Sequence, residues 1–245
     1  MIVEYIAVGI LVGFISGFFG IGGGTILVPT LMMLGLDIKE AVGISVTQMV
    51  FSSLFGTYLN FKKSIFKIKD GLFLGLGGAL GALGSGYFVT IVNSKILEYM
   101  FLAVVLFALY RFFRKDVEEI NEKEISKKVL FFLGIFVGLF AISIGVGGAI
   151  LITPILVGIF HYDVKKAASM GLFFVIFSSI SGFLSLSMFG HIDYLYGFLV
   201  GVSSLVGVFF GINLAHKTNR KRFKSLLLIL YFVILIMSAK KIFLG

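Results

Sequence analysis

The sequence contains no cysteine, only two prolines and few charged residues. Without cysteine the chain can form neither a disulfide nor a thiolate metal site, and it has no thiol redox chemistry. Charged residues make up 13% of its 245 residues, whereas soluble domains contain about 25%. This scarcity of charge excludes a soluble enzyme.

Apolar residues take the place of charge and make up 59% of the chain. Uncharged runs of roughly 20 residues recur, each long enough to cross a hydrocarbon core about 30 Å thick. These runs are continuously apolar, which is typical of membrane helices, whereas the strands of a membrane barrel alternate. We therefore predict an all-α polytopic membrane protein whose surroundings are the lipid bilayer. Its eight apolar segments are Tyr5–Leu34, Ala41–Phe61, Leu72–Val92, Ile96–Phe113, Val129–Phe160, Ala167–Phe189, Leu195–Ala215 and Phe223–Ala239.

The net charge of +9 indicates membrane topology and not a nucleic-acid partner, because the basic residues cluster in short loops between apolar segments. The only long polar stretch lies between the fourth and fifth segments and carries both charge signs. The predicted organisation is therefore a membrane repeat over residues 1–113, a polar cytoplasmic linker over 114–128 and a second membrane repeat over 129–245.

The two halves share motifs in the same order. The decapeptide Gly20-Ile-Gly-Gly-Gly-Thr-Ile-Leu-Val-Pro29 is matched, 125 residues later, by Gly145-Val-Gly-Gly-Ala-Ile-Leu-Ile-Thr-Pro154. One residue out of that register, Phe51-Ser-Ser-Leu-Phe-Gly56 aligns with Phe177-Ser-Ser-Ile-Ser-Gly182, and Asp37 aligns with Asp163. Two unrelated apolar stretches rarely keep glycine, proline, aspartate and paired serines in register, so the sequence indicates an internal duplication.

The first and fifth segments are longer than a membrane requires. Each has about 30 residues, or roughly 45 Å as a straight helix. A glycine cluster interrupts each of them, and Pro29 or Pro154 follows. Glycine permits unusual backbone angles, proline suits the first turn of a new helix, and Thr153 is placed to act as its N-cap. We expect two half-helices that meet at an unwound point, broken or re-entrant.

The distribution of lysine and arginine supports that topology for the fifth segment; no lysine or arginine precedes the first segment, and only the repeat indicates that it behaves alike. If the first and fifth segments enter and return on one side while the other six cross, all basic residues but Lys39, Lys95, Lys240 and Lys241 lie in cytoplasmic loops. The two four-segment repeats then have opposite orientations. Inverted repeats with broken helices are the plan of many secondary transporters.

The glycine clusters are the predicted substrate site. Backbone N–H groups and the positive end of the following half-helix would face a cavity there and hold an anion. The clusters comprise Gly20, Gly22, Gly23, Gly24, Gly145, Gly147 and Gly148. Other glycines follow helical spacing and predict close helix packing: Gly77, Gly81, Gly84, Gly197, Gly201, Gly207 and Gly211.

No charged residue lies deep in an apolar segment, which weighs against a proton pump or a cation exchanger. Substrate contacts would then come from uncharged polar side chains, of which Gln48 is the rarest type. A hydrogen bond to its own helix is the alternative role for any one serine. The candidates are Ser16, Thr25, Ser143 and Thr153 near the breaks, and Ser45, Thr47, Gln48, Ser52, Ser53, Ser169, Ser178 and Ser179 on the second helix of each half.

Neither a catalytic set nor a metal or cofactor site is expected. Gly84-Ser85-Gly86 is not followed by a histidine on a neighbouring apolar stretch that could activate the serine. Histidines stand only at segment ends, where solvation explains them; proton coupling through His161, or through His191 with Asp193, is the alternative. Asp37 and Asp163 precede the second helix of each half and are expected to cap it.

The duplicated G-x-G-G-[G/A]-x-x-x-x-P motif and the F-S-S-x-x-G motif resemble those of the TauE/SafE family, the sulfite-exporter-like permeases. The resemblance covers essentially the whole chain. It implies export of sulfite or an organosulfonate across the inner or plasma membrane of a prokaryote, with Gly20–Pro29 and Gly145–Pro154 at the centre. Ala149 departs from the first copy, which has Gly24, so the half-sites are expected to differ.

The leading hypothesis is thus a secondary permease for small sulfur-containing anions, working by alternating access. An anion channel of the same fold and a permease for a non-sulfur solute are the alternatives. A membrane-embedded enzyme is disfavoured because no nucleophile–base pair is visible.

Overall fold

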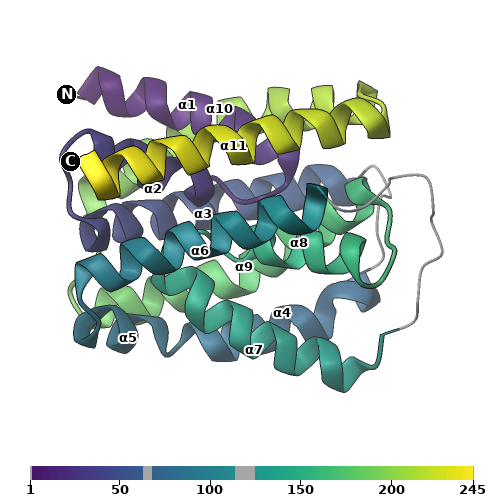
Figure 1. Ribbon diagram of the computed structural model, residues 1–245, viewed down its shortest axis with the longest axis horizontal. Coiled ribbons are helices and arrows are strands. Elements are labelled where there is room, and N and C mark those ends of the chain that lie inside the picture. Colours follow the sequence, from purple (N-terminus) through teal and green to yellow (C-terminus); the bar gives the residue numbers. More distant parts are fainter. Residues whose placement is uncertain (1, 63–67, 114–124, 245) are drawn as a thin grey trace.

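The computed structural model describes residues 2–62, 68–113 and 125–244, and within them the chain forms eleven helices joined by short turns (Figure 1). An all-helical fold follows from the long apolar runs, because a helix satisfies its backbone polar groups internally. The helices are α1 (Ile2–Phe19), α2 (Gly24–Met33), α3 (Ile38–Lys62), α4 (Ile68–Ala82), α5 (Ser85–Ile91), α6 (Ser94–Phe113), α7 (Lys127–Ser143), α8 (Ala149–Gly158), α9 (Val164–Met188), α10 (Tyr194–Lys217) and α11 (Arg220–Leu244).

Six helices are long and apolar enough to cross a membrane, namely α1, α3, α6, α9, α10 and α11. The pair α4–α5, bent by 40°, makes a seventh if it counts as one span. The remaining helices are shorter: α7 has 17 residues, and α2 and α8 have ten each. The chain is therefore a polytopic helical protein, and helices lie in all eight predicted apolar segments.

The first and fifth predicted segments are each interrupted at the glycine cluster, as expected. Gly20, Gly22, Gly145, Gly147 and Gly148 all have positive φ angles, between 66° and 86°, which glycine adopts without strain. The predicted N-cap role of Thr153 is wrong. The second half-helix starts at Ala149 with Gly148 as its N-cap, so both prolines lie inside α2 and α8. The left-handed glycines end the unwound stretch before the chain reaches either proline.

A third break, between α4 and α5, is not predicted by the sequence pattern. Ser185 on α9 stabilises it from outside, since its hydroxyl donates to the Leu83 carbonyl (2.7 Å) and accepts from the Gly86 N–H (2.9 Å). Backbone groups freed by a bend at membrane depth need such partners.

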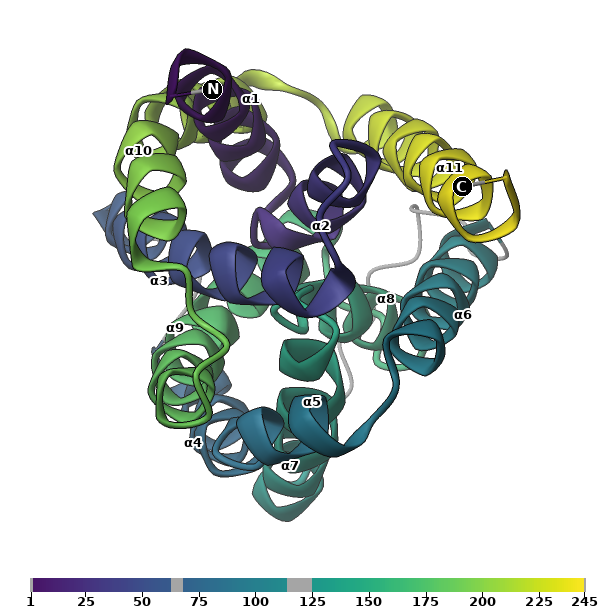
Figure 2. The same cartoon turned by 90° about the vertical axis from the view of Figure 1, so that its left-hand side faces the viewer.

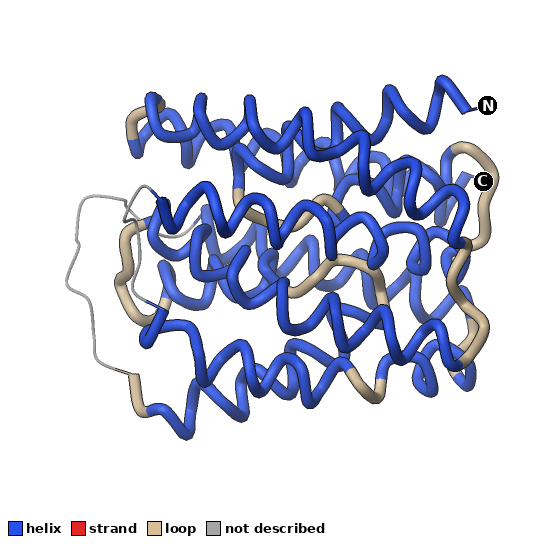
Figure 3. The backbone as a smooth tube through the Cα atoms, turned by 180° about the vertical axis from the view of Figure 1, so that it is seen from behind, coloured by secondary structure: helices blue, strands red, loops and turns tan. Residues whose placement is uncertain are grey.

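Both half-helix pairs turn back inside the molecule (Figures 1 and 3). Tyr5, near the start of α1, and Leu36, just after α2, line the same cavity at one end. At the opposite end, Lys127 of α7 lies 5.3 Å above the Phe73 ring, and the end of α8 lies beside the guanidinium of Arg111.

The helices form two matching groups around a central α3–α9 pair (Figure 2). In one group α1 packs along α10, and in the other α7 packs along α4. Glycines make these approaches close, because a Cβ at Gly207 would collide with the Ile10 carbonyl and one at Gly77 with the Phe131 carbonyl. The prediction that the regularly spaced glycines serve helix packing is confirmed for Gly77, Gly81, Gly197, Gly201, Gly207 and Gly211, whereas Gly84 lies in the turn between α4 and α5.

Candidate functional site

The two glycine breaks meet in the interior, between α3 and α9. A Cβ at Gly24 would collide with the carbonyl oxygen of Gly145, so only glycine permits this approach. The hydroxyl of Ser45 donates to the same Gly145 carbonyl at 2.8 Å, and that of Ser178 donates to the Gly147 carbonyl at 3.2 Å. The second helix of each half thus contributes a serine to the second break.

Equivalent residues of the two halves surround the meeting point. Met49 and Val175, which occupy matching places in the repeats, both lie against Gly22 and against Gly147. A Cβ on Gly22 would be 3.5 Å from the Met49 sulfur and 3.4 Å from a Val175 methyl group. The N-termini of the half-helices α2 and α8 are therefore brought to one place. Each leaves its first backbone N–H groups without an intrahelical partner and carries about half a positive charge.

Gln48 is the polar side chain that distinguishes the first break. It is fully buried, its Oε1 atom adjoins Gly23, and neither its oxygen nor its nitrogen has a hydrogen-bond partner. In the second half Phe174 takes the corresponding place, with its ring against Gly148. The two half-sites therefore differ at two pairs of positions. One is the pair Gln48 and Phe174, and the other is the Gly24–Ala149 pair noted in the sequence.

The remaining polar candidates divide into two groups. Thr47 and Ser143 donate to the carbonyl one turn earlier in their own helices, at 2.9 and 2.7 Å, which is the structural role considered above. The hydroxyls of Ser52, Ser53 and Ser179 also contact only their own helices. In contrast, Ser16, Thr25 and Thr153 have buried hydroxyl groups with no partner. The last of these lies at the interface of α8 with α9, near Gly171.

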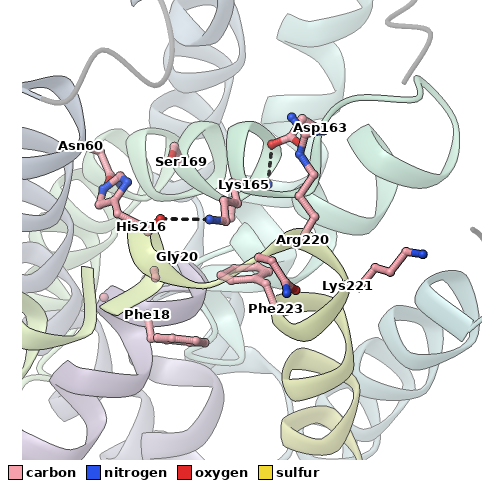
Figure 4. A pocket seen from close by; sticks show the side chains of 14 residues that line it. Phe18, Gly20, Asn60, Asp163, Lys165, Ser169, His216, Arg220, Lys221 and Phe223 are labelled. Carbon is pink, nitrogen blue, oxygen red and sulfur yellow. Dashed lines mark hydrogen bonds and ion pairs between the residues drawn. The ribbon is translucent and has the colours of Figure 1, made fainter. Parts of the chain in front are cut away.

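A cavity of about 620 Å³ leads from one end of the molecule to the first break (Figure 4). Gly17 and Gly20 form part of its wall, and the predicted site residues in its lining are Gly20 and Ser169. Its polar lining is rich in positive charge. The polar residues of the lining are Asn60, Asp163, Lys165, His216, Asn219, Arg220 and Lys221.

Two contacts organise the charge in this cavity. The Arg220 guanidinium forms an ion pair with Asp163, and Lys165 donates to the carbonyl of His216 at 3.4 Å. Asp163 also caps α9 by accepting from the N–H groups of Lys165 and Lys166, which confirms its predicted role. Only one acidic residue therefore offsets three basic side chains in the cavity lining.

At the other end, a cavity of about 750 Å³ is lined by Lys39, Glu40, His191 and Asp193, among others. The ring of His191 hydrogen-bonds to the Thr90 hydroxyl at 2.9 Å. Burial and the nearby Lys39 ammonium lower the pKa of His191 below its usual range. Asp193 caps α10 through the Tyr196 N–H.

The contacts at the two ends correspond. Lys39 donates to the Thr90 carbonyl at 3.4 Å, just as Lys165 donates to that of His216. Asp37 accepts from the Lys39 N–H at 2.8 Å, which confirms its predicted cap role. Asp37 also accepts from the Ser94 hydroxyl, at the position where Asp163 of the other half pairs with Arg220. At corresponding positions, the aspartate thus accepts a hydrogen bond from a serine hydroxyl at one end and forms an ion pair with an arginine at the other.

Comparison with known proteins decides the family. The model of the sulfite exporter TauE/SafE family matches residues 5–238. The chain belongs to the TauE/SafE family. It is similar to the probable membrane transporter protein YunE of Bacillus subtilis, with 24% identity over 98% of this chain and 97% of that protein. It is also similar to the probable membrane transporter protein MJ0441 of Methanocaldococcus jannaschii, with 26% identity over 88% of this chain and 85% of that protein. No solved structure matches.

As a TauE/SafE member with at least six apolar helices of membrane-spanning length, the protein is a multi-pass membrane transporter. Sequence reasoning missed the polar lining of the cavity of about 620 Å³, chiefly Asn60, Lys165 and Arg220. Lys165 and Arg220 entered the argument only as topological signals. Their positions at the starts of α9 and α11, just after the turns between apolar segments, were the available clue.

Proposed function

We propose that the protein is a secondary permease for small sulfur-containing anions, sulfite or an organosulfonate, and that it exports them by alternating access. The observation that carries this proposal is the meeting of the α2 and α8 N-termini in the interior, beside the buried Gln48. Two half-helix ends provide positive potential and N–H donors without a buried cation. This arrangement suits an anion that must be released again.

The proposed architecture is an inverted repeat of residues 1–113 and 129–245, joined by a cytoplasmic linker over 114–128. The pairs α1–α2 and α7–α8 are re-entrant, and the other six segments cross. The matched packing of α1 on α10 and α7 on α4 supports this arrangement, as do the matched lysine contacts at the two ends. The linker itself lies mostly outside the described residues.

The charged cavity is proposed to be the cytoplasmic entrance. Its excess of basic groups attracts anions toward Gly20, and field lines concentrate in a cleft with low-dielectric walls. Rocking of one repeat against the other would then close this end and open the cavity near Lys39. The sidedness rests on the excess of lysine and arginine at this end.

Anion-dependent thermal stabilisation of the purified protein tests the substrate class. Sulfite, thiosulfate, sulfoacetate, sulfate, phosphate, nitrate and chloride are compared, because a ligand that binds only the folded form raises its stability. We expect a selective response to sulfite or a sulfonate. A response only to another solute would be consistent with a transporter but would refute the proposed sulfur-containing substrate.

Gly23→Val tests the site, because a side chain there collides with the Gln48 amide while the backbone angles of Gly23 remain ordinary. Gly158→Ala is the matched control, since its new Cβ meets only the movable Arg111 side chain. We expect loss of anion stabilisation in the first variant alone. Equal responses in both would refute the site.

Counterflow in proteoliposomes separates a carrier from the alternative, an anion channel. A carrier loaded with unlabelled anion accumulates labelled anion transiently, whereas a channel only equilibrates it. Conductance without counterflow would favour the channel.

A further inference from the structure

Gln48 is a buried amide that lacks any hydrogen-bond partner in the described structure. Its exposed fraction is 0%, and both its Oε1 and Nε2 atoms are unpaired. Such a group destabilises a folded chain, and buried polar groups are nearly always paired in native proteins. Its position at the meeting point of two broken segments indicates that another molecule supplies the partner.

The immediate surroundings of Gln48 are rich in donors. Gly23, which its oxygen adjoins, is the N-cap of α2, so the first N–H groups of that helix are close by. Thr25, in the first turn of α2, has a fully buried hydroxyl that is also unpartnered. An oxyanion could accept from these groups and from Nε2. Oε1, however, requires a ligand atom that donates a hydrogen.

The positive potential at this point matches a single negative charge. Two half-helix N-termini together supply about one positive charge. A dianion would bring a second, uncompensated charge into a low-dielectric interior, which is costly.

Ionisable side chains of the helices packed around α3 lie toward the ends of those helices and not beside Gln48. In the described part of the chain they are Glu4 and Tyr5 of α1, Lys39, Glu40, Tyr58 and Lys62 of α3, Lys95, Glu98, Tyr99, Tyr110 and Arg111 of α6, Lys127 and Lys128 of α7, Lys165 and Lys166 of α9, and Tyr194, Tyr196, His216 and Lys217 of α10; α2 has none.

We propose that this site takes its oxyanion in the singly charged, hydrogen-bearing form, for example hydrogen sulfite and not sulfite. Gln48 donates from Nε2 to an oxygen of the anion and accepts the hydroxyl hydrogen of the anion at Oε1. The inference rests on the proposed anion permease and names the species that it carries. Because Phe174 replaces the amide in the second half, each chain has one such site.

Thermal stabilisation by sulfite is measured across the pH range in which hydrogen sulfite loses its proton. Methanesulfonate serves as a monoanion of constant charge without a hydroxyl group, and sulfate as a dianion. Above the ionisation of the ligand, we expect the apparent affinity for sulfite to fall about tenfold per pH unit, because only the protonated fraction binds. Methanesulfonate should bind more weakly and independently of pH, and sulfate should not bind.

Three outcomes contradict the proposal in different ways. Sulfite affinity that does not fall with rising pH, or clear binding of sulfate, overturns the monoanion inference and leaves the permease intact. If the affinity for methanesulfonate fell with rising pH in the same way, the titrating group would belong to the protein, and the monoanion inference would be overturned as well. If no anion stabilises the protein, the proposed function and this inference fall together.

Gln48→Met tests the residue, since methionine has a similar shape without donor or acceptor. We expect a roughly ten- to hundredfold loss of hydrogen sulfite affinity, as for a hydrogen bond to a charged group, with a smaller loss for methanesulfonate. The ligand-free melting temperature should stay equal or rise, which shows that the variant folds. Thr57→Val is the control on the same helix, because it also removes a buried polar atom without a partner, and it should keep its affinity. Unchanged affinity in Gln48→Met would overturn the proposal.

Discussion

Single side chains decide how the two breaks are held together. Ser45 and Ser178 lie on corresponding helices, α3 and α9, and each donates to a carbonyl of the second glycine cluster. The first cluster has Gln48 nearby instead, without a bond. The second break is therefore held by the protein itself, while the first retains unsatisfied groups. We interpret the first break as the half of the site that binds.

The link from Ser45 to Gly145 predicts a measurable loss when it is removed. Ser45→Ala leaves a buried carbonyl without this donor, so we expect a destabilisation of about 1–2 kcal/mol. Thermal unfolding in detergent measures it. Ser52→Ala is the control, because its hydroxyl contacts only its own helix, and it should change stability by less than about 0.5 kcal/mol. Equal losses in both variants would show that the link across helices contributes nothing.

Among the helices, those with breaks depend on their neighbours. The bend between α4 and α5 leaves backbone groups that α4 itself cannot satisfy, and Ser185 of α9 bonds to both of them. The glycines of α1 and α7 similarly let these helices pack closely on α10 and α4. Helix geometry in this protein is thus set partly by contacts from the other half of the chain.

Ser185→Ala should destabilise the protein more than an ordinary serine substitution does. It orphans the Leu83 carbonyl and the Gly86 N–H together, and we expect a cost of about 2–3 kcal/mol. Ser238→Ala provides the comparison, as this buried hydroxyl bonds only within α11. The difference in melting temperature between the two variants reports the contribution of the bridge; no difference would contradict it.

The charged cavity predicts a salt-dependent effect on transport. Lys165→Gln removes one of the cations that line it, so the initial rate of anion entry from that side should fall several-fold at low ionic strength. The deficit should shrink at high salt, where exposed charges are screened. Lys39→Gln is the matched variant at the other end and should leave entry from the first side unchanged. A deficit that is insensitive to salt would point to a structural role for Lys165.

At the scale of the whole molecule, the two halves of the chain interlock, since the half-helix pairs α1–α2 and α7–α8 each pack against helices of the other half. The α1 helix contacts α10, and α7 contacts α4, around the central α3–α9 pair. Neither half buries its apolar faces alone. The alternating access proposed above would slide these glycine-lined contacts past each other, and the close approach of the backbones there favours small, rigid movements.

The absence of cysteine makes a direct test of the topology simple. Single cysteines are placed at Lys62, Lys217, Lys95, Val3 and Leu34, and vesicles of both orientations are treated with a thiol reagent that does not cross membranes. We expect the first two to react from the cytoplasmic face and the other three from the opposite face. Reaction of Val3→Cys and Leu34→Cys from different faces would show that the first segment crosses.

Most of the fold could be predicted from the sequence, because its signals are local. Long apolar runs indicate helices, and the two glycine clusters that precede Pro29 and Pro154 interrupt theirs as expected. The restart position was misjudged at Thr153, because several left-handed glycines end the unwound stretch earlier than proline propensity suggests. The break beside Gly84 could not be predicted, since the residue that satisfies it, Ser185, is about a hundred positions away.

The sequence by itself determined the membrane class, the duplication signal and the two glycine breaks, since each depends on composition or on spacing along the chain. Only the tertiary structure decided which of the polar candidates have unpartnered groups and which are bonded within their own helices. Thr47 and Gln48 are neighbours in sequence, yet the hydroxyl of one is bonded within its helix and the amide of the other is buried without a partner. Likewise, Lys165 and Arg220 gather in one cavity only because α9 and α11 begin at the same end. Hydrogen-bond satisfaction and burial depend on contacts between distant segments, and these contacts exist only in the folded chain.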